Sequence, residues 1–276
     1  MAGSILDLVN QARRLTIPLF QTFLTNYQNG LYLEFTKAQL SEIHSCRSTI
    51  DIITHGSYKI NLASTTYYAD SCYFLKKELE LARKLESEYL IMHPGSVDDI
   101  QKFDQGVEII ARKINSIFKK NERYPSVVLE NVAFNKRTIG GDITHLAAIR
   151  DRLDKPEKVK FCIDTAHAYS YGYNIATELG QHEFLQLVEL VLGFESIGLI
   201  HLNDTQEQCG SFHDRHDIPG QGSIGLPALK QLANHERLKQ ISIIMELPVM
   251  PEEQLQTVFN EVQEFITNKK IDTKKE

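Results

Sequence analysis

The chain alternates short β-rich runs with longer amphipathic stretches throughout its length, and no other feature of the sequence constrains its fold as much. The β-rich runs are Ile17–Leu24, Ile50–Thr54, Tyr89–Met92, Val127–Leu129, Val159–Ile163, Ile197–Ile200 and Ile241–Met245. The amphipathic stretches, predicted to be helices, are Ser4–Arg14, Thr36–Cys46, Thr66–Ser87, Asp98–Asn121, Asp142–Leu153, Ile175–Leu192, Leu226–Leu238 and Glu252–Thr267. Such alternation is typical of a parallel sheet whose strands are joined by helices.

The order of these elements favours a barrel that lacks one strand. The pattern begins with a helix, whereas a closed (β/α)8 barrel needs a further strand before Ser4. We therefore predict an α/β fold of the TIM (β/α)8 type, with only seven strands evident and the first missing. A doubly wound open sheet is the structural rival. A length of 276 residues suits one barrel, so residues 1–276 are predicted to form a single domain with a frayed tail from about residue 269.

Six of the seven predicted strands are followed directly by a histidine or a carboxylate. These residues are His55, His93, Glu130, Asp164, His201 and Glu246. One such residue, taken alone, is more often structural than functional. In a parallel barrel, however, all six would converge on the rim that carries barrel active sites. Buried together they would repel or stay unsatisfied without cations, and imidazole with carboxylate is the ligand set of Zn²⁺ and related divalent metals.

Two local motifs extend this cluster of ligands. Asp164 and His167 are three residues apart where a strand turns into a helix, and Asp214 and His216 lie on one side of an extended loop. The resulting nine candidates suffice for about three metals with about three protein ligands each. The glycine-rich run Gly220–Gly225 could also offer backbone N–H groups to a phosphate, although a plain turn is at least as good an interpretation.

Composition bears on partners and location. The formal net charge of −6 argues against nucleic-acid binding, an objection that weakens if three divalent cations add about six positive charges in one cleft. No apolar run approaches the roughly 20 residues of a membrane span, so no membrane partner is expected. The four cysteines form no CxxC pair and are interpreted as reduced thiols, and with no signal segment evident we expect an intracellular, cytoplasmic protein.

At these residues the sequence resembles the endonuclease IV family, zinc-dependent apurinic/apyrimidinic (AP) endonucleases built on a TIM barrel of the xylose-isomerase-like type. The resemblance runs from about Ile17 to Thr267. It is carried by His55-Gly56-Ser57-Tyr58, His93-Pro94-Gly95-Ser96, Leu129-Glu130-Asn131, Cys162-Ile163-Asp164-Thr165-Ala166-His167-Ala168, His201-Leu202-Asn203-Asp204, Asp214-Arg215-His216 and Met245-Glu246.

The resemblance implies three zinc ions per chain and a DNA repair reaction. The first zinc ion would be held by His55, His93 and Glu130, the last as a bridging carboxylate. The ligands of the other two would be Glu130, Asp164, His201 and Glu246 for the second, and His167, Asp214 and His216 for the third. The substrate would be duplex DNA with an abasic site, cut on its 5′ side by a monomer to leave a 3′-hydroxyl.

The resemblance also assigns individual roles. Glu246 would orient the attacking water beside the bridging Glu130, and both are taken as catalytic. Tyr58 would be the wedge at the lesion, and Gln28, Asn29 and Arg215 would contact DNA. The chain departs from the family in its missing first strand, in Asn29 where the family has arginine, and in Lys59 where it has leucine. The alternatives are a metal-dependent sugar isomerase or epimerase of the same barrel superfamily, and a catalytically impaired lesion binder.

Overall fold

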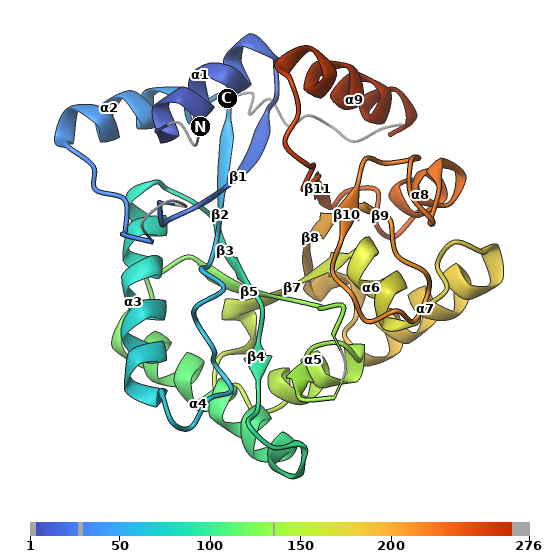
Figure 1. The fold of residues 1–276 in the computed structure, drawn as a ribbon. Coiled ribbons are helices and arrows are strands. Elements are labelled where there is room, and N and C mark those ends of the chain that lie inside the picture. Colours follow the sequence, from blue (N-terminus) through green and yellow to red (C-terminus); the bar gives the residue numbers. More distant parts are fainter. Residues whose placement is uncertain (1–3, 27–29, 135, 267–276) are drawn as a thin grey trace.

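The computed structural model describes residues 4–26, 30–134 and 136–266, and within them seven parallel strands form a barrel that is nearly closed (Figure 1). The strands are hydrogen-bonded in the order β1 (Leu19–Phe23), β2 (Asp51–His55), β3 (Tyr89–Met92), β5 (Ser126–Glu130), β7 (Val159–Asp164), β8 (Ile197–His201) and β11 (Ser242–Ile244). All six pairings are parallel. The predicted barrel of seven strands is therefore confirmed, and the doubly wound open sheet is excluded.

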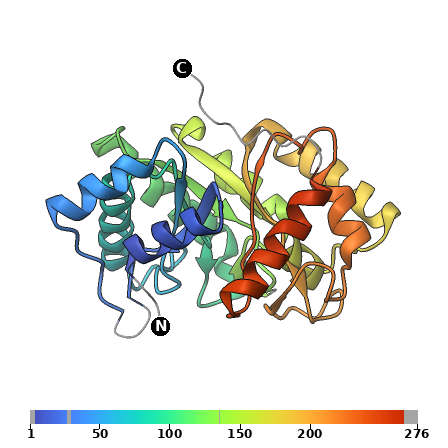
Figure 2. The same ribbon diagram turned by 90° about the horizontal axis from the view of Figure 1, so that it is seen from above.

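The helices cover the outside of the barrel (Figures 1 and 2). They are α1 (Ile5–Arg14), α2 (Lys37–Cys46), α3 (Tyr68–Lys84), α4 (Phe103–Lys120), α5 (Ile143–Arg150), α6 (Thr165–Tyr171), α7 (Glu178–Val191), α8 (Leu226–Ala233) and α9 (Glu252–Phe265), with three short 3-10 turns, Ile100–Lys102, Pro156–Lys158 and Phe194–Ser196. Of these, α6 lacks a counterpart among the predicted helical stretches because its seven residues follow Asp164 without a loop. Within the described ranges, no helix combines the length and the apolarity that a membrane span requires.

The seam between β1 and β11 is the place where the barrel does not close through backbone pairing. These are the two edge strands of the sheet, and among the described residues no backbone hydrogen-bond ladder joins them. On the outer surface the seam is bridged by α1 and α9, where the Arg14 guanidinium lies 2.9 Å from a carboxylate oxygen of Glu252. Apolar side chains of both helices and both strands line a cavity of about 590 Å³ that reaches the mouth of the barrel. The seam is therefore the place where the sequence pattern predicted a further strand.

An apolar layer fills the barrel directly below the strand ends. It consists of Ile53, Ile91, Val128, Cys162, Leu199 and Ile244. Each of these residues lies two positions before one of the six ligand candidates, and side chains two apart on a strand point to the same face. The alternation that buries this layer therefore also aims the six polar side chains into the mouth of the barrel.

Two short antiparallel pairs shape the loops above the strand ends. β4 (Gly95–Ser96) pairs with β6 (Thr138–Ile139), and β9 (Asp204–Thr205) pairs with β10 (His216–Asp217). The second pair carries His216, which faces Thr205 in the register. Neither pair was predicted, since two-residue strands leave no periodic signal. The predicted frayed tail from residue 269 falls outside the described residues.

Candidate metal centre

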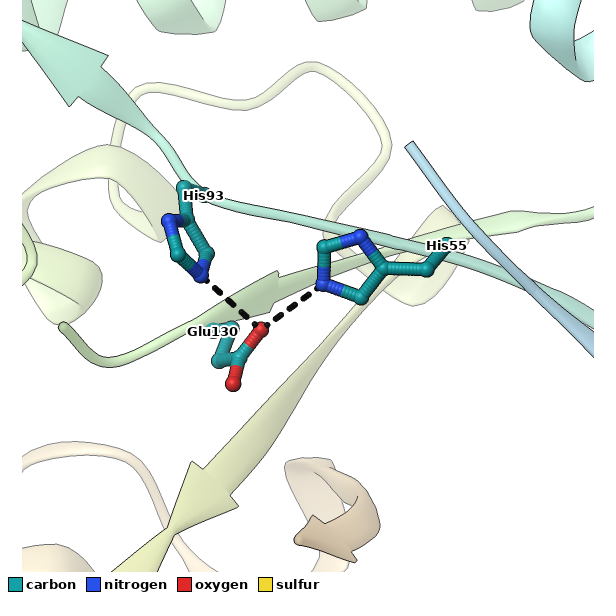
Figure 3. Close-up of side chains that lie close together, drawn as sticks. All are labelled: His55, His93 and Glu130. Carbon is teal, nitrogen blue, oxygen red and sulfur yellow. Dashed lines mark hydrogen bonds and ion pairs between the residues drawn. The ribbon is translucent and has the colours of Figure 1, made fainter. Parts of the chain in front are cut away.

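The first group of candidate ligands contains His55, His93 and Glu130 (Figure 3). One carboxylate oxygen of Glu130, Oε2, lies 3.2 Å from Nε2 of His55 and 3.3 Å from Nε2 of His93. Figure 3 shows both rings turning a nitrogen toward this oxygen. His55 and Glu130 are completely buried, whereas His93 retains some solvent contact.

The second group contains Glu130, Asp164, His201 and Glu246. The other oxygen of Glu130, Oε1, lies 2.8 Å from Nδ1 of His201. The same nitrogen lies 3.7 Å from Oδ2 of Asp164 and 3.4 Å from Oε2 of Glu246. Because its two oxygens face different groups, Glu130 is placed as a bridging carboxylate would be.

The third group joins His167 to the loop that carries Asp214 and His216. One oxygen of Asp214 lies 3.2 Å from Nε2 of His167 and 3.2 Å from Nε2 of His216. These two ring nitrogens are 3.4 Å apart. Asp164 also approaches this group, with its Oδ2 3.7 Å from Nε2 of His216. The structure thus brings all nine candidates together at one end of the barrel.

The spacing of these atoms suits zinc. Ligand atoms about 2.1 Å from a tetrahedral Zn²⁺ lie about 3.4 Å from one another. In the first and third groups the separations given above are 3.2–3.7 Å. Two of the groups share Glu130, so neighbouring cations would share a ligand. The donor set and its spacing therefore fit a cluster of divalent metal ions.

The electrostatics of the centre favour added positive charge. Burial lowers the pKa of His201, but the neighbouring Cys162, Glu246 and Glu130 outweigh burial and raise this pKa well above its ordinary value. The pKa of His167 is likewise raised against its burial, by Asp164, Asp214 and Glu130. Raised pKa values of buried imidazoles indicate a strongly negative potential at this centre. Divalent cations can take the place of the protons that such imidazoles bind.

Two histidines are oriented by backbone carbonyl groups. Nδ1 of His55 lies 2.8 Å from the carbonyl oxygen of Gly56, and Nδ1 of His167 lies 2.9 Å from that of Asn131. A carbonyl can only accept, so each Nδ1 carries the hydrogen and each Nε2 is left free to bind a metal. In both rings Nε2 is the atom that faces the ligand group.

Asn131 and Asn203, to which the sequence pattern assigned no role, hold the carboxylate ligands in place. The Asn131 side chain accepts the Asp164 N–H at 2.7 Å and donates to the Asp164 carbonyl at 3.1 Å. The Asn203 amide donates to Oδ2 of Asp164 at 2.6 Å and accepts the Glu246 N–H at 2.7 Å. Both follow ligands in the quoted motifs, so their position after a strand end was the available signal.

The glycine-rich run is not a phosphate site. The buried carboxylate of Asp204 accepts the backbone N–H groups of Gly220, Gly222, Ile224 and Gly225 at 2.9–3.2 Å. A Cβ on Gly222 would come within 2.5 Å of an Asp204 oxygen, which explains the glycine. The phosphate interpretation is therefore wrong: a side chain of the protein already occupies these donors and fixes the loop that follows β10.

Of the four residues expected to contact DNA, the structure describes two, Tyr58 and Arg215. Tyr58 is 65% exposed, and its ring centre lies 5.5 Å from that of His55 and 5.1 Å from that of His93. It therefore stands over the first group of ligands. Arg215 is exposed beside Glu207, at 3.8 Å. Gln28 and Asn29 lie outside the described residues.

Comparison with known proteins agrees with the fold and the site. A family model described as the xylose isomerase-like TIM barrel matches residues 11–269, so the chain is a barrel protein of that class. "Probable endonuclease 4" of Halorhodospira halophila is 36% identical over 205 residues, which are 73% of this chain and 69% of that protein. By this similarity the chain belongs to the endonuclease IV family, as the motifs predicted.

Solved structures give the same result. The crystal structure of endonuclease IV from Thermus thermophilus superimposes with a TM-score of 0.81 at 26% identity, covering 95% of this chain and 96% of that one. A D-tagatose 3-epimerase-like protein superimposes with a TM-score of 0.69 at 16% identity, covering 90% of this chain and 89% of that one. The second likeness shows the shared fold alone.

Proposed function

We propose that this protein is a zinc-dependent AP endonuclease that hydrolyses the phosphodiester on the 5′ side of an abasic site in duplex DNA and leaves a 3′-hydroxyl. The observation that carries the proposal is the convergence of nine ligand candidates into three groups that share Glu130 and Asp164. Membership of the endonuclease IV family supports the same reaction class. The protein is proposed to act as a monomer inside the cell, in the cytoplasm.

The residues of the centre have distinct tasks in such a reaction. Zinc ions held here would lower the pKa of a bound water to near 7 and offset the charge of the phosphate. Glu130 is completely buried and bridges two groups, whereas the side chain of Glu246 is 17% exposed and is reached from the mouth. This exposure supports Glu246 as the carboxylate that would orient a water molecule toward a phosphodiester above the centre.

Charge explains how an acidic protein would attract DNA. Four carboxylates, those of Glu130, Asp164, Asp214 and Glu246, face the centre. Set against three divalent cations, they leave about two positive charges at the mouth of the barrel. A local positive potential attracts a phosphate even though the chain as a whole carries −6. Tyr58, Arg215, Gln28 and Asn29 are proposed to contact the DNA around this point, with Tyr58 as the wedge at the lesion.

The alternative reaction, isomerisation or epimerisation of a sugar, accounts for less of the site. The fold is shared with such enzymes. Isomerisation needs one or two metals, however, and the group of His167, Asp214 and His216 then has no evident task. That third group favours phosphodiester hydrolysis, where a further cation can offset charge on the leaving oxygen.

One assay separates the proposed reaction from its alternatives. The zinc-loaded protein is incubated with an end-labelled duplex that contains a single abasic analogue, with and without a chelator. We expect a single nick 5′ to the analogue, abolished by the chelator and followed by primer extension from the new 3′-hydroxyl. If the duplex stays intact, the proposed nuclease activity is rejected. Binding without nicking would favour the impaired lesion binder.

A further inference from the structure

Gln21 lies in the middle of β1 and connects two of the candidate ligands across the seam of the barrel. Its side-chain amide nitrogen donates to Oε1 of Glu246 at 2.6 Å. Its side-chain oxygen lies 2.9 Å from Nε2 of His201. The opposite orientation of the amide would place its oxygen against the Glu246 carboxylate, so the geometry selects this one.

These contacts determine which atoms of the two ligands are available to a metal. An amide oxygen only accepts, so Nε2 of His201 carries a hydrogen and Nδ1 is the nitrogen left to bind a metal ion. That Nδ1 faces Glu130, Asp164 and Glu246 in the second group. Likewise, Gln21 holds Oε1 of Glu246 and leaves Oε2 directed at His201.

The anchoring of His201 differs from that of the other two buried histidines of the centre. His55 and His167 are oriented by backbone carbonyl groups, which the fold itself fixes. His201 depends on a side chain from a strand that is not paired with β11. β1 is also the strand whose end carries none of the six predicted ligands. It reaches the centre through a mid-strand residue instead.

We propose that Gln21 is a positioning residue of the metal centre, which presents Nδ1 of His201 and Oε2 of Glu246 to one metal ion from across the open seam. This inference rests on the zinc centre proposed above. Residues that orient metal ligands typically change metal affinity by about 10- to 100-fold when removed. The effect should be confined to the ion of the second group.

The test replaces Gln21 by methionine, which has similar length and no strong hydrogen-bonding group. The matched control is Gln11→Met, because Gln11 also donates to a glutamate across the same seam, Glu252 at 3.3 Å, but does so at the surface between α1 and α9. Zinc binding is titrated against a chromophoric chelator. Nitrogen-15 NMR of the zinc-loaded proteins reports which nitrogen of His201 carries hydrogen.

We expect Gln21→Met to lower the affinity for one of the zinc ions by about 10- to 100-fold and to leave the affinity for the others unchanged. The Nε2–H signal of His201 should broaden. Gln11→Met should match the wild type. A second variant, Gln21→Glu, keeps an acceptor for His201 but sets a carboxylate against Glu246, and should also lower the affinity for that zinc ion. It provides the same test if the methionine variant does not fold.

The inference is overturned if the Gln21 variants bind all their zinc like the wild type. It is also overturned if Gln11→Met weakens zinc equally, because the effect would then come from the seam as a whole. Failure of the wild-type protein to bind zinc would instead reject the proposed metal centre, so the two failures are distinguishable.

Discussion

Replacing Glu78 by glutamine should remove a pH dependence that burial imposes on the stability of this fold. Glu78 lies on α3 with no solvent-exposed surface, and both of its carboxylate oxygens accept the Ser57 N–H, at 3.1 and 3.2 Å. Burial raises the pKa of this carboxyl from 4.5 to about 7, although the Ser57 N–H, His55 and Tyr32 act in the opposite direction.

The sign and size of the effect follow from the raised pKa. A carboxyl group whose pKa is higher in the folded protein than in the unfolded chain does not reduce the free energy of unfolding below its unfolded pKa. As pH rises from that value through the folded pKa, the free energy of unfolding falls. A rise from 4.5 to about 7 corresponds to about 3 kcal/mol, most of it lost between about pH 5 and about pH 8. Glu78→Gln cannot ionise and keeps an acceptor for Ser57, so this loss should be absent.

The assay is urea unfolding of both zinc-loaded proteins across that pH range, so that titrations common to both cancel. We expect the wild type to lose about 2–3 kcal/mol more than Glu78→Gln on going from about pH 5 to about pH 8. Glu80→Gln is the control and should follow the wild type, because Glu80 lies on the same helix but its side chain is 41% exposed and, among the described residues, accepts only the Tyr124 hydroxyl and the Lys76 ammonium group as near partners. Parallel curves for the wild type and Glu78→Gln would refute the reasoning.

Three other changes test the centre and the loops around it. Glu246→Gln should lower cleavage of abasic DNA by orders of magnitude while gel-shift binding to the same duplex survives, and an equal loss of binding would make Glu246 structural. Asp204→Asn should destabilise the protein to urea by about 3 kcal/mol or more, because an amide cannot accept all of the N–H groups that the carboxylate holds; an unchanged midpoint would show that the loop is held by other contacts. Chelation should lower the melting temperature sharply, because the proposed metal ions would connect six strand ends and bind only the folded state. If the chelated protein melts as high as the metal-loaded one, the seam is held by other means.

The barrel and the convergence of the six strand-end residues could be predicted because both depend on a repeating pattern. The two-residue period of the strands ties each strand-end ligand, such as His55 or Glu130, to an apolar partner two positions earlier, such as Ile53 or Val128. Convergence then follows from parallel pairing, in which Asp164 lies opposite His201.

The residues that orient the ligands could not be predicted in this way. Gln21 is a mid-strand glutamine whose importance depends on the approach of β1 to Glu246 across an unpaired seam, and a tertiary contact of that kind leaves no periodic trace. For Asp204, by contrast, a local sequence signal was present but indicated the wrong ligand. The glycines that accommodate its carboxylate have the same local signature as a phosphate loop, and only the fold shows which anion they bind.

Metal analysis of the gently purified protein shows whether three zinc ions share this centre. We expect about three zinc ions per chain, since nine residues can supply about three ligands to each. His216→Ala should hold about one fewer, because His167 and Asp214 alone leave the third site short of ligands. A content near one zinc ion per wild-type chain, or an unchanged content in His216→Ala, would rule out a centre of three zinc ions.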